Sequence, residues 1–231
     1  DRIFPVRIDV TDESSMSAAL GWVREQLDGK ALGGLVNNAG LAVPAFLELI
    51  PMERLRYQFE VNVFGLVRMT QLALPLLRGA RNPRIVNVSS ILGRFGVPIL
   101  GAYAASKFGV EAISDTLRVE LADWKIRVVT VEPGSIATNF SKNARNQIPE
   151  PPDGIELAPP YRRMADRLGS ENASEGSGAS PDVVARVVAG AISSANPKAR
   201  YRVGRDAATL NFLRWILPDF LFDRLVLSAR G

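Results

Sequence analysis

The apolar positions along the chain follow two different spacings. Short apolar runs predict buried strands, and stretches with an apolar position every three or four residues predict amphipathic helices. The predicted strands span residues 4–10, 32–36, 84–89, 126–131 and 200–204. The predicted helices span residues 12–27, 52–77, 103–124 and 181–194, and an amphipathic tail begins at Leu210. Strands that alternate with helices are typical of βαβ units, so this order predicts an α/β protein with a parallel sheet.

The stretch between Thr138 and Pro181 differs from the rest of the chain. It contains several prolines and a string rich in glycine and serine at residues 169–180. A loop of this length inside a compact domain is usually functional or disordered, and we interpret residues 139–180 as a lid over a substrate. The length of 231 residues suits one α/β domain, so we expect residues 1–231 to form a single domain.

The composition excludes several kinds of chemistry. Because the chain contains no cysteine, it has no disulfide, no thiol nucleophile and no thiolate metal site. Because it contains no histidine either, it has no Ser-His-Asp triad and no HExxH zinc site, and we expect no bound metal. Any proton transfer must therefore use tyrosine, lysine or a carboxylate.

The charge pattern gives no sign of a nucleic-acid partner. The net charge is +4, and the basic residues are spread along the chain rather than gathered in a stripe with aromatic residues between them. Residues 1–12 carry charges throughout and lack the apolar core of a signal peptide. The apolar tail at 210–227 is interrupted by charges and by Pro218. These features predict a cytoplasmic protein, in which packing of the tail on the domain is favoured over contact with a membrane surface.

Small or polar residues follow most of the predicted strands. In open parallel sheets, ligands bind beyond the carboxyl ends of the strands. The candidate ligand positions are therefore Asp9 and Val10, residues 37–40, Ser89 and Ser90, and residues 133–138. The helix after residue 102 adds Tyr103 and Lys107, and a spacing of four places both side chains on one helical face.

Tyr103 and Lys107 offer a mechanism of proton transfer that needs no histidine. A lysine ammonium beside a tyrosine favours the phenolate and lowers the tyrosine pKa from its usual value of about 10. Tyr103 would then exchange a proton with a substrate hydroxyl while a hydride leaves the carbon. Ser90 would donate a hydrogen bond to the developing oxyanion.

These residues, in this order, resemble the compact single-domain members of the short-chain dehydrogenase/reductase family. The matching set is Asp9-Val10, Asn37-Asn38-Ala39-Gly40, Asn62, Ser90, Tyr103-x-x-x-Lys107, Pro133-Gly134 and Thr138. The resemblance covers nearly the whole chain and is weakest after Thr138. It implies a Rossmann-like doubly wound parallel sheet, and NAD or NADP as the cofactor.

The resemblance also implies four catalytic residues. Tyr103 would be the general acid and base, and Ser90 would orient the substrate oxygen. Lys107 would bind the nicotinamide ribose and lower the pKa of Tyr103. Asn62 would kink its helix and hold a water molecule in a proton relay to Lys107. Besides Tyr103 and Lys107, the implied cofactor-binding residues are Asp9 and Val10 at the adenine, Asn38, Ala39 and Gly40 at the adenosine ribose, and Pro133, Gly134, Ile136 and Thr138 at the nicotinamide.

One part of the family pattern is absent from the printed sequence. The resemblance implies a first βαβ unit before Asp9, with a glycine-rich turn between its first strand and its helix. That turn binds the pyrophosphate, and the end of the second strand selects NAD or NADP, so the preference between the two cannot be read. We therefore expect the sequence to be the later part of a longer chain, without roughly 50 residues that precede it.

The resemblance implies an NAD(P)-dependent oxidoreductase that interconverts a secondary alcohol and a ketone, or an aldehyde. The gap between Tyr103 and Lys107 is shorter than in the related enoyl reductases, which favours carbonyl chemistry over double-bond reduction. Apolar residues of the lid, such as Phe140 and Tyr161, indicate a lipophilic substrate like a steroid, retinoid or lipid.

A non-catalytic dinucleotide-sensing or scaffolding protein on the same fold is the alternative. Members of the family are usually homodimers or homotetramers, joined through helices that correspond to residues 52–77 and 103–124.

Overall fold

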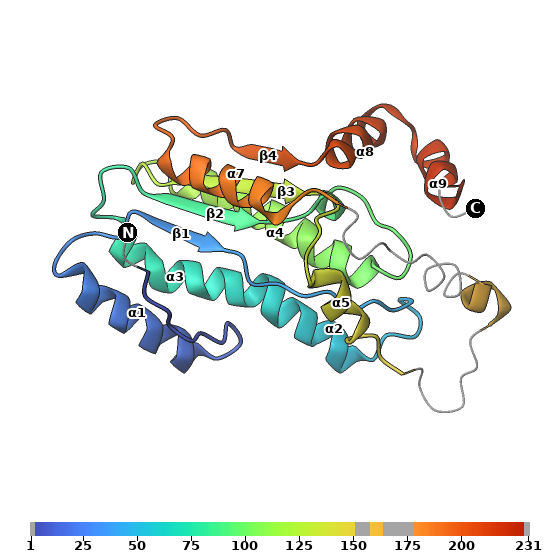
Figure 1. Ribbon diagram of the computed structural model, residues 1–231, viewed down its shortest axis with the longest axis horizontal. Helices are drawn as coiled ribbons and strands as arrows, with labels where there is room; N and C mark the ends of the chain where they lie inside the picture. Colours follow the sequence, from blue (N-terminus) through green and yellow to red (C-terminus); the bar gives the residue numbers. More distant parts are fainter. Residues whose placement is uncertain (1–2, 151–157, 164–177, 229–231) are drawn as a thin grey trace.

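The computed structural model describes residues 3–150, 158–163 and 178–228. A parallel sheet lies between helices on both of its faces (Figure 1). The strands are β1 (Gly34–Asn37), β2 (Arg84–Val88), β3 (Arg127–Pro133) and β4 (Arg200–Val203). The α-helices are α1 (Glu13–Leu27), α2 (Met52–Phe59), α3 (Gly65–Leu77), α4 (Gly101–Glu120), α5 (Phe140–Arg145), α7 (Pro181–Ser193), α8 (Arg205–Ile216) and α9 (Asp219–Ser228). A π-helical segment, η1 (Glu60–Phe64), joins α2 to α3, and a 3₁₀ turn, η2 (Ile91–Gly93), follows β2.

The strands pair in the order β1-β2-β3-β4, and every pairing is parallel. Leu35 pairs with Ile85 and Ile85 with Val128, so apolar side chains line up across the sheet. Because the strands run in the same direction, their carboxyl ends meet at one edge. The predicted α/β class is confirmed, and β1 to β4 agree with four of the five predicted strands to within two residues at each end.

The prediction of a strand at residues 4–10 is wrong. Residues 3–9 have no regular secondary structure, and Phe4, Val6 and Ile8 are exposed by 50%, 38% and 40%. A strand needs a partner for its backbone hydrogen bonds, and none of the described strands pairs with this segment. Instead, the ring of Phe4 contacts Trp22 of α1, with 5.5 Å between the ring centroids.

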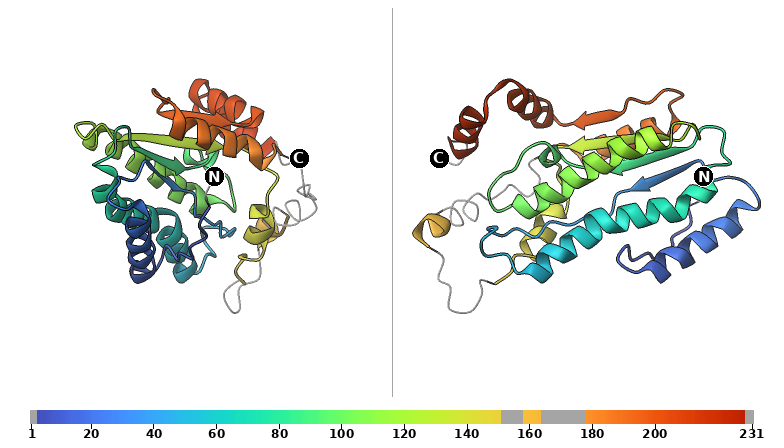
Figure 2. Two further views of the ribbon diagram at one scale, coloured as in Figure 1. Left: turned by 60° about the vertical axis from the view of Figure 1, so that its left-hand side comes forward. Right: turned by 180° about the vertical axis from the view of Figure 1, so that it is seen from behind.

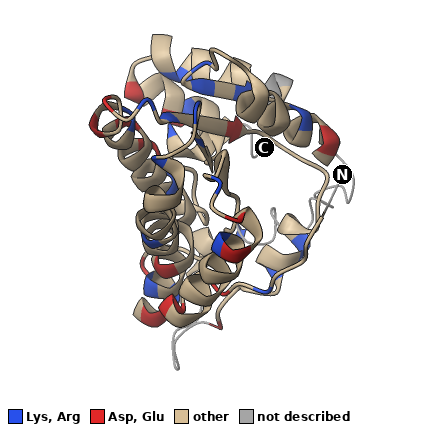
Figure 3. Ribbon diagram, turned by 90° about the vertical axis from the view of Figure 1, so that its left-hand side faces the viewer, with Lys and Arg blue, Asp and Glu red and all other residues tan. Residues whose placement is uncertain are grey.

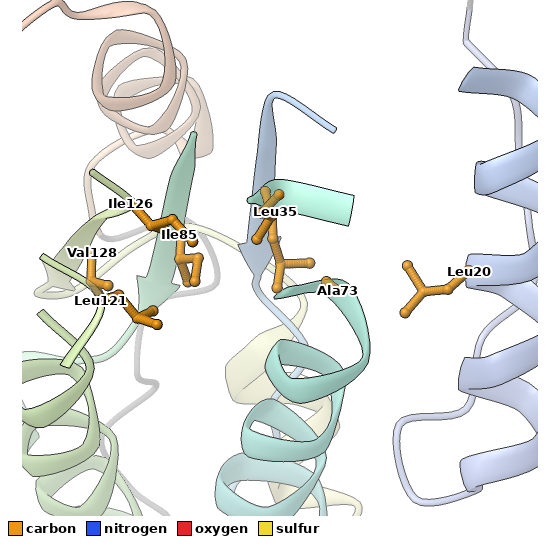
Figure 4. Packing of buried hydrophobic residues seen from close by; sticks show 8 residues of the cluster. Leu20, Leu35, Ala73, Ile85, Leu121, Ile126 and Val128 are labelled. Atoms are coloured by element: carbon orange, nitrogen blue, oxygen red, sulfur yellow. The ribbon is translucent and has the colours of Figure 1, made fainter. Parts of the chain in front are cut away.

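Apolar layers on both faces hold the sheet between its helices. On one face, beside α3 and α4, lies a cluster that includes Leu35, Ile85 and Val128 (Figure 4). Leu20 joins this cluster from α1, which packs on the outer side of α3 (Figure 2). On the opposite face, α7 packs against Val129 and its apolar neighbours. Burial of one such side chain contributes about 1.5–3 kcal/mol relative to exposure.

The predicted long helix at residues 52–77 forms as three consecutive segments. α2 and α3 are α-helical, and η1 between them is π-helical and contains Asn62. Single π-helical turns of this kind are frequent at functional sites.

The predicted lid contains two described helical pieces, α5 and a turn at residues 159–163. Its other parts at residues 151–157 and 164–177 lie outside the described residues.

The surface carries mixed charges and, at the C-terminal end, exposed aromatic side chains. Acidic and basic residues are interspersed over the helices (Figure 3), as expected for a solvated surface. Trp215 of α8 is 82% exposed and Phe220 of α9 is 64% exposed, whereas Phe222 packs against Phe95. Within the described part of the chain, no helix is both long enough and apolar enough to cross a membrane.

Candidate active site

Ser90 and the pair Tyr103 and Lys107 come together beyond the carboxyl end of β2. Ser90 precedes η2, and its Oγ accepts a hydrogen bond from the backbone N–H of Leu92 at 3.2 Å. η2 packs on α4, the helix that carries Tyr103 and Lys107. All three site residues are buried, with no more than 8% of any of them exposed. The fold therefore joins residues that the sequence places on separate elements.

Lys107 Nζ lies 5.7 Å from the centroid of the Tyr103 ring, and the side chain of Ser90 is close enough to act on the pKa of Tyr103. Burial raises the pKa of Tyr103 to about 12, and Ser90 opposes this shift. In the chain without a cofactor, burial is therefore the dominant influence on the pKa of Tyr103, and the lowering expected from Lys107 together with a bound nicotinamide ring stays a prediction. A further positive charge beside the phenol would favour the phenolate.

Lys107 is held against the end of β2. Its Nζ donates a hydrogen bond to the backbone oxygen of Val88 at 2.9 Å. An ammonium carries three donors, so Lys107 has donors for ligand hydroxyls beyond this bond. Burial lowers the pKa of Lys107 to about 8, while the carboxylate of Glu111 acts to raise it. Below that pH, Lys107 presents a positive charge to the site.

Asn62 in η1 connects three parts of the site. Its Oδ1 accepts a hydrogen bond from the backbone N–H of Leu41, and its Nδ2 donates to the backbone oxygen of Leu41 and to Ser106 Oγ, each at 2.9 Å. These bonds tie the π-helical segment to the loop after β1 and to α4. At Asn62, where the family resemblance implies a kink, the helix changes to a π-helical turn.

The loop after β1 has the properties of a ligand cradle. Asn38, Ala39 and Gly40 are exposed at the carboxyl end of the strand. A Cβ atom at Gly40 would lie 3.3 Å from Asn62 Oδ1 and 3.4 Å from Lys107 Nζ. A larger residue would therefore fill the space in front of Lys107. The family resemblance implies that Asn38, Ala39 and Gly40 contact the adenosine ribose, and their exposure is compatible with that contact.

Asp9 and Val10 lie beside the same group of elements. A Cβ atom at Gly65, the first residue of α3, would lie 2.6 Å from the backbone oxygen of Val10, so Gly65 permits this close approach. Asp9 Oδ1 accepts hydrogen bonds from the backbone and the hydroxyl of Thr11, at 2.9 and 2.7 Å, which lower the pKa of Asp9. The structure thus places Val10 near η1, and it shows Asp9 stabilising a local turn.

The segment after β3 continues the same edge of the sheet. Pro133 ends β3, and the backbone N–H of Gly134 donates to the backbone oxygen of Val203 at 2.8 Å. Ile136 forms a parallel bridge with Ala179. Thr138 Oγ1 accepts a hydrogen bond from the backbone N–H of Phe140 at 3.2 Å, at the start of α5. These residues occupy the edge where the sequence predicts a nicotinamide contact.

The comparisons with known proteins agree with this geometry. A model described as short chain dehydrogenase matches residues 1–149. The chain belongs to this family. Human retinol dehydrogenase 16 is 34% identical over an alignment of 239 residues, which covers 98% of this chain and 73% of that protein. Mouse 17-beta-hydroxysteroid dehydrogenase type 6 is 37% identical over 240 residues, which cover 100% of this chain and 75% of that protein.

Solved structures of other short-chain dehydrogenases have the same fold. One from Streptomyces avermitilis is 27% identical and has a TM-score of 0.76, over 100% of this chain and 79% of that one. One from Burkholderia cenocepacia, solved in complex with NADP, is 26% identical and has a TM-score of 0.70, over 99% of this chain and 78% of that one. The Rossmann-like sheet and the class of NAD(P)-dependent oxidoreductases acting on CH–OH groups are confirmed.

The structure of this short-chain dehydrogenase also shows residues near the site that sequence reasoning missed. Arg94, Glu111 and Glu132 form partly buried ion pairs close in sequence to Ser90 and Lys107. The signal that could have found them is the presence of carboxylates at inward-facing positions of an otherwise apolar strand and helix. Asn37 has a structural role, because its Nδ2 donates to Thr70 Oγ1 at 3.1 Å and to Asn87 Oδ1 at 2.9 Å inside the core.

Proposed function

We propose that this enzyme interconverts a lipophilic secondary alcohol and the corresponding ketone, or an aldehyde, through a relay of Tyr103, Lys107, Ser90 and Asn62. The observation that carries the proposal is the meeting of the buried tyrosine, lysine and serine next to apolar side chains. Three polar groups suited to proton transfer would not be buried together by packing alone, because unpaired polar groups are costly to bury.

The apolar side chains packed around Tyr103 support a lipophilic substrate. Tyr103 packs with Ala42 and Ala144, and Leu92 packs against this cluster. The ring of Phe140 lies 5.6 Å from the ring of Tyr103. A substrate rich in hydroxyl groups would leave polar atoms without partners against these side chains. Two relatives are named for retinol and for a hydroxysteroid, which are lipophilic alcohols.

In the oxidation, the phenolate oxygen of Tyr103 takes the proton of the substrate hydroxyl as the hydride leaves the carbon. Ser90 donates its hydroxyl hydrogen to the substrate oxygen, and its own oxygen is oriented by the N–H of Leu92. The ammonium of Lys107 stabilises the phenolate. In the reduction, the O–H of Tyr103 donates its proton to the carbonyl oxygen.

Bound NAD or NADP would supply the hydride acceptor or donor and, when oxidised, a positive ring. The residues that would hold its nicotinamide side are Lys107 and the segment from Pro133 to Thr138, and Asn38, Ala39 and Gly40 would hold its adenosine ribose. Asn62 holds the loop after β1 against α4, so that Gly40 and Lys107 stay in contact with the same ligand.

A substrate panel tests this proposal. The full chain is assayed with NAD⁺ and NADP⁺ against cyclic and long-chain secondary alcohols, and against small polyols and sugars, by the absorbance of reduced nicotinamide. We expect turnover with the lipophilic alcohols. Turnover confined to polyols and sugars would overturn the substrate class. Tight binding of NADH or NADPH without turnover of any alcohol would favour the sensing or scaffolding alternative.

We also propose a cytoplasmic homodimer or homotetramer that uses the helices at residues 52–77 and α4. Phe64 in η1 is 54% exposed and Phe108 in α4 is 45% exposed, so both helices offer apolar surface to a second copy. Light scattering measures the mass in solution. The Phe108→Glu variant is expected to give a smaller particle, and a wild-type particle with the mass of one chain would contradict the proposal.

A further inference from the structure

We propose that Arg94, Glu111 and Glu132 form a positioning cluster that holds the catalytic segments of this enzyme in place. They lie at the end of η2, on α4 and on β3. The inference rests on the proposed function, because it concerns how that site keeps its geometry.

Arg94 bridges the two carboxylates. Its Nη2 donates to Glu111 Oε2 at 3.0 Å and to Glu132 Oε1 at 2.7 Å, and its Nε donates to Glu132 Oε1 at 3.0 Å. The side chain of Glu132 is fully buried, and that of Glu111 is 6% exposed. Buried charges require partners with good geometry. The guanidinium and both carboxylates therefore restrict one another's positions.

Each member of the positioning cluster is close in sequence to the site. Ser90 lies four residues before Arg94, on the other side of η2. Lys107 lies one helical turn before Glu111 on α4. Glu132 is the next-to-last residue of β3, beside the segment that carries the candidate nicotinamide contacts. The guanidinium of Arg94 thus connects the segment that carries Ser90, the helix that carries Tyr103 and Lys107, and the strand that precedes the candidate nicotinamide contacts.

Close packing at Gly93 supports the same conclusion. A Cβ atom there would lie 3.0 Å from Glu111 Cγ, 3.0 Å from Ser89 Oγ and 3.1 Å from the backbone oxygen of Lys107. η2 therefore rests directly on α4 at the level of Lys107. By contrast, a Cβ atom at Gly96 would meet no described atom within 4 Å. The two glycines form a matched pair for mutation.

β4 adds cations that hold the carboxylates without touching η2. Arg200 Nε donates to Glu111 Oε2 at 3.1 Å and lies 3.5 Å from Glu132 Oε1. Arg202 Nε donates to Glu132 Oε2 at 3.3 Å from a position that is 52% exposed. Because these arginines remain, a substitution at Arg94 releases η2 without leaving either carboxylate unpaired.

The charge of Glu111 also acts on Lys107. The titratable side chains near Lys107 on its own helix are Tyr103 and Glu111, and the carboxylate raises the pKa of Lys107 against the effect of burial. Burial and the neighbouring Glu132 raise the pKa of Glu111 itself. The groups that face Glu111 from other elements are Ser89, Arg94, Glu132 and Arg200.

Two substitutions test the positioning of η2 by independent means. Arg94→Lys keeps the charge but loses the planar fork that spans two carboxylates, and Gly93→Ala displaces the turn without changing any charge. We expect each to lower kcat by about tenfold or more, since misplacement by about 1 Å costs up to about a hundredfold. The KM for the cofactor is expected to change by less than about threefold.

The controls are Arg202→Lys and Gly96→Ala. Arg202→Lys changes an arginine on β4 that also bonds to Glu132. Both are expected to keep kcat within about twofold of wild type. Circular dichroism and thermal unfolding establish that each variant is folded. Folded Arg94→Lys and Gly93→Ala variants with kcat within about twofold of wild type would overturn the inference. So would equal losses in the test variants and their controls.

A readout that needs no turnover tests the link from Glu111 to Lys107. The pH dependence of acylation of Lys107, followed by mass spectrometry of its peptide, reports the pKa of the amine. Glu111→Gln removes the carboxylate that raises this pKa, so the midpoint is expected to fall by about half a unit or more. Arg202→Lys is expected to leave the acylation midpoint unchanged. An unchanged midpoint in Glu111→Gln would contradict the effect of Glu111 on the pKa of Lys107.

These outcomes separate the inference from the proposed function. Loss of turnover in Tyr103→Phe together with full turnover in Arg94→Lys and Gly93→Ala would overturn only the positioning cluster. Unchanged turnover in Tyr103→Phe would overturn the proposed function, whereas the acylation midpoint would still decide whether Glu111 acts on Lys107.

Discussion

The two sides of the candidate site are attached to the fold in different ways. We call residues 88–94 and 103–111, which carry the proposed catalytic residues, the reaction wall, and residues 140–148 and 158–163, which we propose to lie over the substrate, the substrate cover. In the reaction wall, several buried polar side chains bond to other side chains or to the backbone, as Lys107 does to Val88 and Arg94 does to Glu111. In the substrate cover, Tyr161 hydrogen-bonds to Glu48 at 2.6 Å and stacks on Phe46 at a centroid distance of 4.2 Å, in exposed surroundings.

The difference separates two kinds of kinetic effect. Buried bonds fix the distance between the proton donor and the reacting oxygen, so changes in the reaction wall should act mainly on kcat. The substrate cover touches the reaction wall through apolar contacts, such as Phe140 on Tyr103. Apolar contacts are not directional, so changes in the substrate cover should act mainly on KM and on the choice of substrate.

The largest effect in this comparison is expected for Lys107→Met. The change removes both the ammonium and its bond to Val88, and we expect kcat/KM to fall about 10²–10³-fold. Steady-state kinetics measures the loss, with Lys30→Met at an exposed position as the control. Activity of Lys107→Met within about twofold of wild type would place the charge outside the mechanism.

The second prediction concerns pH. Because burial lowers the pKa of Lys107 to about 8, kcat/KM for ketone reduction should be level below that pH and fall above it, by about tenfold per unit. Tyr103, with a pKa of about 12, keeps its proton throughout this range.

The free energy of unfolding is expected to change with pH in the opposite direction to kcat/KM. Above pH 8 the folded chain holds fewer protons at Lys107 than the unfolded chain does. The contribution of this residue to the free energy of unfolding therefore rises with pH, up to the unfolded pKa of about 10.4. Urea unfolding between pH 7 and 10 should show this rise in wild type relative to Lys107→Met. If the free energy of unfolding of wild type instead fell with pH relative to that of Lys107→Met, the lowered pKa of Lys107 would be contradicted.

A smaller effect, on the other side of the site, is expected for Phe140→Ala. Loss of the ring beside Tyr103 removes apolar contact area, so the KM for a bulky lipophilic alcohol should rise about tenfold with little change in kcat. A short alcohol that does not reach Phe140 is the matched control substrate. A fall in kcat with both substrates would place Phe140 in the reaction wall.

The smallest effect is expected for Tyr161→Phe. The variant loses the hydrogen bond to Glu48 but keeps the stacking on Phe46. Both kcat and KM should stay within about twofold of wild type, since exposed contacts contribute little. A larger change in KM would show that this contact orients the substrate cover during binding.

The elements that the sequence predicts well are those whose signal is local. β1 to β4 and α1, α4 and α7 follow from apolar runs and helical spacing. The strand predicted at residues 4–10 fails because strand formation depends on a neighbour, which no local pattern reveals. The resemblance implied a kink at Asn62 but not the π turn at Glu60–Phe64, where Asn62 bonds to Leu41, 21 residues away in the chain.

The same distinction holds for the site. Tyr103 and Lys107 share a helical face, and Ser90 follows a strand, so sequence spacing reveals all three. The positioning cluster escaped detection because Arg94 pairs with Glu111 and Glu132 across 17 and 38 residues of chain. The raised pKa of Tyr103 was missed as well, since burial depends on packing from several elements.

The central claim is that Tyr103 transfers the proton while the surrounding residues hold the cofactor and the substrate. The most direct test compares Tyr103→Phe with wild type in turnover of a lipophilic alcohol and in calorimetric titration with NADH and NADPH. The account predicts a fall in kcat of about 10²–10⁴-fold, with cofactor affinity within about threefold of wild type. Unchanged turnover in the folded variant would contradict it.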